Sequence, residues 1–124
     1  MRLSEAIRLG AMLGPQAFGA TFENEKSCAL GSALRAISIT DRPWTATADV
    51  WPFVYTRAQH PVLGDTYLVI TIIRELNDLH RWTREAIADW VATVEPPEAA
   101  DAVREDTALP IVTPRATSSG VVLA

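Results

Sequence analysis

The single cysteine and the two histidines are the residues of this chain best suited to nucleophilic or acid–base chemistry. Cys28 falls in the first turn of a predicted helix, where the helix dipole favours a thiolate. With His60 or His80 as the base, that thiolate would be a nucleophile. The alternative is a small buried side chain, which is where a free cysteine usually lies. We expect the buried, unreactive role.

Three polar residues end the predicted third helix, which spans residues 67–79. His80 can stabilise the negative end of the helix dipole, and Asn77 and Asp78 can hydrogen-bond the backbone of the turn. The chain contains no glycine-rich phosphate loop, serine-nucleophile elbow or paired-carboxylate motif. We therefore expect these three residues to be structural.

The most strongly specified element is a helix from Thr83 to Val94. Thr83 is a good N-cap, because its hydroxyl can accept from the open N–H groups of the first turn. Trp82 and Ile87 then occupy the two positions of a hydrophobic staple. Pro96 and Pro97 end the helix, since proline cannot donate to the helix ladder and restricts the preceding residue.

Two further helices are expected in the first third of the chain. One spans Leu3 to Leu13 with Ser4 as its N-cap, and the other spans Ser27 to Ile37 with Ser27 as its N-cap. Gly31 inside the second helix suggests that another helix approaches closely there.

The remaining segments contribute less regular structure. Residues 17–22 and the polar turn at residues 23–26 allow one short β-hairpin, and residues 38–50 read as irregular. The predicted fold class is therefore mainly α: a small single-domain bundle of about four helices.

The charge pattern separates a body from a tail. Residues 1–94 carry nine basic and ten acidic side chains, whereas residues 95–124 carry two basic and five acidic ones. We expect a compact helical domain over residues 1–95 and a flexible, acidic and partly apolar tail over residues 96–124, with a short helix from Pro97 to about Glu105. The chain lacks a basic footprint, so nucleic acid is not an expected partner.

Composition also bears on where the protein works. A single cysteine excludes an internal disulfide and suits a reducing compartment. Residues 1–13 carry charges and no long apolar block, and the most apolar run, residues 67–73, is far short of the ~20 residues of a membrane span. We expect a soluble protein, cytoplasmic or virion-associated, without membrane contact and not secreted.

Two blocks of the sequence form a recognisable pattern. The first is Leu-Ser-Glu-Ala-Ile-Arg-Leu-Gly at residues 3–10, followed by Ser-Cys-Ala-Leu-Gly at 27–31, and the second is the stretch of residues 76–91 that begins Leu-Asn-Asp-Leu-His-Arg-Trp-Thr-Arg-Glu. Together they resemble a family of small uncharacterised bacterial and phage proteins. In that family a Cys-Pro-x-Cys-Gly knuckle precedes the third helix and a His-Leu-Asn-Asp-x-His segment ends it. The resemblance implies a Cys2His2 zinc site at this corner.

This chain departs from the family pattern at three of the four ligand positions. His60 and Leu63 stand at the cysteine positions, Glu75 stands at the first histidine position, and His80 alone is kept. Leucine cannot ligate a metal, so a closed structural zinc site is not available. A three-ligand site of His60, Glu75 and His80 would suit zinc or iron with one open position. The favoured alternative is that the metal was lost and apolar packing around Leu63 took its place.

The sequence is compatible with three functions. The leading hypothesis is a non-catalytic structural or protein-interaction module, which associates with a protein partner or with itself through the tail; the resemblance adds a phage, virion or assembly role. The first alternative is a helix-turn-helix-like DNA-binding regulator, with residues 83–94 in the major groove and Arg81 and Arg84 near phosphates. The second is a metal-dependent enzyme that uses the residual His/Glu site.

Overall fold

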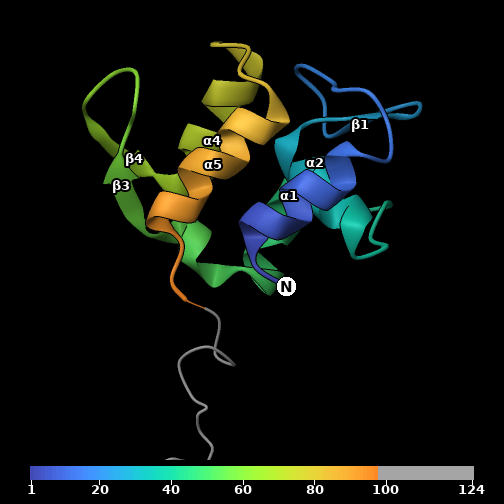
Figure 1. Ribbon diagram of the computed structural model, residues 1–124, viewed down its shortest axis with the longest axis horizontal. Helices are drawn as coiled ribbons and strands as arrows, with labels where there is room; N and C mark the ends of the chain where they lie inside the picture. The colour runs from blue at the N-terminus through green and yellow to red at the C-terminus, as the bar shows by residue number, and fades with distance from the viewer. Residues whose placement is uncertain (98–124) are drawn as a thin grey trace, which may run out of the picture.

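The computed structural model describes residues 1–97, which form a mainly helical domain with two small hairpins (Figure 1). The predicted fold class is confirmed. The predictions about the tail beyond Pro97, including the short helix to Glu105, lie outside the described residues. In chain order the elements are α1 Leu3–Ala11, β1 Phe22–Glu23, β2 Lys26–Ser27, α2 Ala29–Ala36, the 3-10 turn η1 Trp44–Ala46, α3 Thr47–Val50, the 3-10 turn η2 Pro52–Tyr55, β3 Arg57–Gln59, β4 Thr66–Leu68, α4 Val69–Asp78 and α5 Arg84–Val94.

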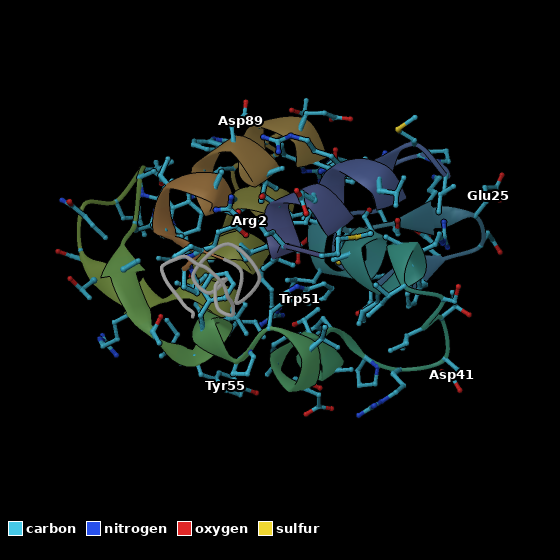
Figure 2. The ribbon with its side chains drawn as sticks, turned by 60° about the horizontal axis from the view of Figure 1, so that its bottom comes forward. Arg2, Glu25, Asp41, Trp51, Tyr55 and Asp89 are labelled. Carbon is cyan, nitrogen blue, oxygen red and sulfur yellow. The ribbon has the colours of Figure 1, made fainter. Side chains whose placement is uncertain are left out.

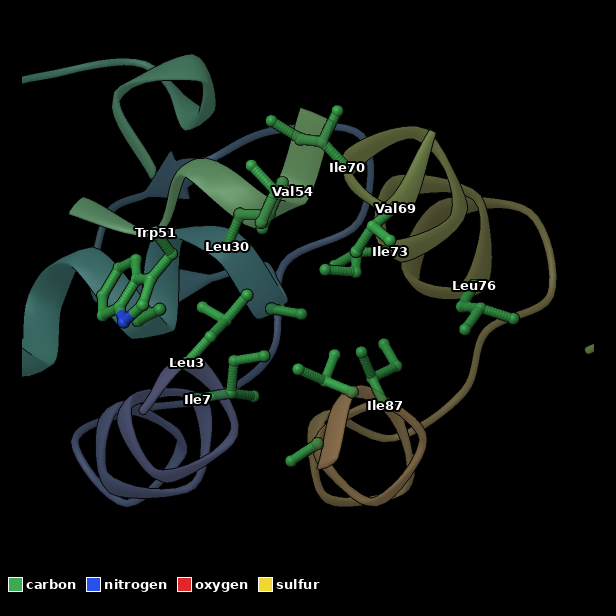
Figure 3. Packing of buried hydrophobic residues seen from close by; sticks show 14 of the residues in the cluster. Leu3, Ile7, Leu30, Trp51, Val54, Val69, Ile70, Ile73, Leu76 and Ile87 are labelled. Atoms are coloured by element: carbon green, nitrogen blue, oxygen red, sulfur yellow. The ribbon is translucent and has the colours of Figure 1, made fainter. Parts of the chain in front are cut away.

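The core forms where α1, α2, α4 and α5 pack together, and Val54 of η2 contributes to it from one side (Figure 3). Apolar side chains recur at three- and four-residue spacing on each of these helices and therefore lie on one face. Full burial of such a side chain contributes about 1.5–3 kcal/mol. The completely buried members from the four helices include Ile7, Leu30, Ile73, Leu76 and Ile87.

Helix α5 matches the sequence prediction closely. Thr83 is its N-cap, and the Thr83 hydroxyl accepts from the backbone N–H of Ala86 at 3.1 Å. The helix ends at Val94 because Glu95 is extended before the two prolines. Trp82, at the staple position before the cap, packs against the core.

The predicted capping serines have other roles. Arg2, not Ser4, is the N-cap of α1, because the Ser4 N–H and hydroxyl both donate to the Glu95 carboxylate. Ser27 ends strand β2, where its hydroxyl bonds that of Ser32, and the cap of α2 is Cys28.

Close helix approach occurs at a glycine other than the predicted one. A Cβ on Gly10 of α1 would lie 1.7 Å from the Ser32 carbonyl oxygen of α2, so only glycine allows this α1–α2 contact. Gly31 faces the carbonyl of Thr21 in the loop before β1, where a Cβ would lie 2.2 Å away. The two helices therefore meet at Gly10.

The third helix is shorter than predicted, because its expected first turn is a strand. Residues 66–68 form β4, which pairs antiparallel with β3, and α4 begins at Val69. The β-branched run after Tyr67 is helical, but residues 1–97 form two hairpins rather than one. Within residues 1–97, every helix is too short or too polar to cross a membrane.

Candidate functional site

The fold brings together the three residues that the resemblance nominated as metal ligands. His60 follows β3, Glu75 lies on α4 and His80 follows the end of α4. One ligand atom from each lies within 4.8 Å of the others. The hairpin β3–β4 delivers His60 to α4, because its last strand runs directly into that helix.

His60 is the buried centre of this group. Its side chain is fully buried, whereas that of Glu75 is partly exposed, and His60 Nε2 lies 3.1 Å from Glu75 Oε1. The His60 ring also makes edge-to-face contacts with His80, at 5.4 Å between ring centroids, and with Tyr67, at 5.8 Å.

Residues 60–64 stand at the position of the family's knuckle, and their backbone determines the tautomer of His60. The N–H groups of Val62 and Leu63 both donate to His60 Nδ1, at 3.1 and 3.2 Å. A nitrogen that accepts hydrogen bonds carries no proton, so the neutral ring carries its proton on Nε2. Nε2–H therefore donates to the Glu75 carboxylate.

This arrangement does not fit a metal ion. Each imidazole nitrogen has one in-plane lone pair; that of Nδ1 already accepts from Val62 and Leu63, and Nε2 is protonated. A metal on Nε2 would move the proton to Nδ1, directly against the two backbone N–H groups. A thiolate at this position has further lone pairs and accommodates both the N–H donors and a metal. The hydrogen bond between His60 and Glu75 therefore stands where a metal would be.

The predicted apolar replacement for the metal is wrong. Leu63 is 50% exposed and Val62 is 47% exposed, so the knuckle points these side chains to the surface. Polar groups that bond one another occupy the position instead.

The predicted role of His80 at the helix terminus is carried out by the backbone. The N–H groups of Leu79 and His80 both donate to the Glu75 carbonyl, and that of Trp82 donates to the Leu76 carbonyl. The His80 ring packs against His60 instead.

Asn77 holds a distant loop rather than its own turn. Its side-chain oxygen accepts from Gln16 Nε2 and from the backbone N–H of Ala29, and its side-chain nitrogen donates to the Ala17 carbonyl and to Asp78. One buried amide thus ties α4 to the start of α2 and to the loop after α1. The sequence suggested the hydrogen bonding but not these partners.

Cys28 lies in a separate cleft of about 290 Å³, lined also by Trp44, Arg74 and Asp78 and by neither histidine. Its Sγ accepts from the Gly31 N–H at 3.3 Å. Burial, with a smaller effect from the negative charge of Asp78, raises the pKa of the Cys28 thiol although the backbone N–H groups oppose the shift. The thiol is therefore protonated at neutral pH, and a cysteine–histidine nucleophile is not assembled.

Arg84 is the structural residue that sequence reasoning missed. It is only 7% exposed, and its guanidinium donates to the carbonyls of residues 11, 14, 15 and 27 and to the Ser32 hydroxyl, at 2.8–3.5 Å. Burial lowers the pKa of Arg84 from its ordinary value. Nothing in the local sequence distinguishes it from Arg81, which is exposed and stacks on Phe18 at 4.3 Å.

The location of Arg84 bears on the DNA-binding alternative. That hypothesis placed Arg81 and Arg84 near phosphates, but Arg84 points into the domain. On the same helix Ile87, Ala88 and Val91 are buried, and Asp89 pairs with Arg8 of α1. Only Arg81 of the two proposed phosphate contacts has an exposed side chain.

No family model, curated protein or solved structure matches the chain. The resemblance described above therefore stays a prediction from the quoted motifs.

Proposed function

We propose that this chain is a non-catalytic protein-interaction module. In this proposal residues 1–95 are the helical body, and residues 96–124 associate with a protein partner or a second copy. A phage, virion or assembly role is the version that the resemblance adds.

The observation that supports the proposal is that the side chains best suited to chemistry make internal hydrogen bonds that stabilise the fold. His60 uses both ring nitrogens in internal hydrogen bonds, Cys28 caps α2, and Arg84 bonds carbonyls of the interior. A catalytic group must instead reach substrate with a free lone pair or proton. These residues therefore stabilise the fold, and their internal bonds occupy the atoms that a reaction would need.

Association tests the proposal directly. Sedimentation of the full chain over a hundredfold range of concentration, alone and with a candidate partner, is compared with that of a chain ending at Glu95. We expect the shortened chain to keep its helical circular dichroism and to lose association. A full-length chain with residues 98–124 in shuffled order is the matched control, since it keeps the length and charge. Undiminished association of the shortened chain would contradict the proposal, and so would its outright unfolding.

Metal content tests the enzyme alternative. Protein purified without chelator is analysed for zinc and iron, beside His60→Ala and a control, Asp65→Ala, which removes an exposed carboxylate from the same hairpin. We expect no stoichiometric metal in any of the three. Stoichiometric metal that is lost only in His60→Ala would contradict the argument that the His60–Glu75 hydrogen bond takes the place of a metal ion.

A further inference from the structure

An apolar groove lies at the end of the body where the chain continues past Pro97. We call it the Trp51 groove; it has a volume of about 370 Å³ and is lined chiefly by Met1, Leu3, Val50, Trp51, Phe53 and Pro97. Figure 2 brings this face forward, with Trp51 and Tyr55 labelled on it. The Trp51 indole is anchored, because its N–H donates to the Met1 carbonyl at 3.0 Å.

Among residues 1–97, the side chains that line the groove offer apolar contact, and the charged ones pair with each other. Met1 is 55% exposed and Val50 is 43% exposed. The charged residues among its described lining are Arg2 and Glu95, which pair with each other at 3.2 Å. Because burial of an unpaired charge is costly, such a groove selects an uncharged, apolar occupant.

The sequence beyond Pro97 contains two apolar runs that meet this requirement: Leu-Pro-Ile-Val at residues 109–112 and Val-Val-Leu at residues 121–123. The first run is separated from the groove by residues 98–108, eleven residues that can span up to ~36–40 Å when extended. Loop closure costs more for a longer connection, as the second run requires.

We propose that residues 109–112 of the same chain occupy the Trp51 groove. Attachment beside the groove gives this segment an effective concentration of about 1 mM or above, well above that of a second copy at micromolar protein. The inference goes beyond the proposed function, and it holds whether or not residues 113–124 bind a partner.

The test uses full-length chains and NMR resonances of the groove. The variant Leu109→Asp/Ile111→Asp is compared with Val121→Asp/Val122→Asp, which introduces the same number of charges into the other apolar run. The readouts are the Trp51 indole N–H and the Val50 methyl groups, with the Leu79 methyl groups at the end of α4 as an internal reference. Backbone amide shifts of α5 report that the body remains folded in both variants.

We expect the first variant to shift the Trp51 and Val50 resonances and leave those of Leu79 unchanged. The second variant should leave all three unchanged, and tenfold dilution of the unmodified chain should have no effect. Unchanged groove resonances in the first variant, or equal shifts in both, would overturn the assignment. Shifts on dilution would overturn it as well, because they would assign the groove to a second copy.

Discussion

Replacing Arg84 by methionine should destabilise the domain far more than the same change at Arg81. The shortest Arg84 contact is a charge-assisted hydrogen bond to the Gly14 carbonyl at 2.8 Å, which contributes about 1.5–3 kcal/mol. The contacts to Ala11, Pro15, Ser27 and Ser32 are longer, at 3.2–3.5 Å.

Two features limit the loss of stability in Arg84→Met. The carbonyls of Pro15 and Ser27 keep backbone partners, the N–H groups of Ser27 and Ala17 respectively, so they are not left unpaired. The Arg84 Nε is buried without a hydrogen-bond partner among residues 1–97, and methionine removes that cost. We therefore expect Arg84→Met to lower the free energy of unfolding by about 2–4 kcal/mol, or the melting temperature by roughly 10–30 °C.

Urea unfolding, followed by far-UV circular dichroism, measures the free energy of unfolding of Arg84→Met and Arg81→Met. Arg81→Met removes an exposed guanidinium stacked on Phe18, so its cost should stay below about 1 kcal/mol. Arg84→Lys keeps the charge but not the forked donor geometry, and should fall between the two. If Arg84→Met and Arg81→Met lost equal stability, the guanidinium would not hold the interior as argued.

Three further predictions follow from buried groups. Burial raises the folded-state pKa of Cys28 above its unfolded value, so the unfolded chain loses the thiol proton first; this contribution to stability is complete below about pH 8.5 and falls as pH rises towards the folded pKa. The urea midpoint should accordingly fall more steeply above that pH than it does in Cys28→Ser, and parallel curves would refute the assignment. Gly10→Ala should cost about 1–3 kcal/mol despite the higher helix propensity of alanine, since its Cβ would overlap the Ser32 carbonyl; an unchanged midpoint would mean that α1 and α2 separate freely. Asn77→Ala should accelerate amide exchange at Ala29, which donates to the Asn77 side chain; unchanged exchange there would assign the protection to the helix alone.

The candidate site was partly foreseeable. The resemblance nominated His60, Glu75 and His80, and the structure places these three side chains together. Their chemistry was not foreseeable, because it depends on two backbone N–H groups of the knuckle that point at His60 Nδ1. The sequence identifies the side chains, but it does not show that backbone N–H groups already occupy the lone pair of His60 Nδ1.

The sequence by itself determined the elements whose signals lie within one or two turns. The N-cap at Thr83, the staple position of Trp82 and the prolines after Glu95 act on their immediate neighbours, and α5 begins and ends as they require.

Only the tertiary structure decided the roles of residues whose partners are distant in sequence. Ser4 reads as a helix cap, yet it bonds Glu95, 91 residues away. Tyr67 reads as helical, but pairing with β3 makes it part of a strand. Arg84 is expected to be a surface charge, but it lies in the core because it bonds carbonyls that are 57 to 73 residues away in sequence. Such partners come within hydrogen-bonding distance only after the helices pack, so the local sequence does not predict them.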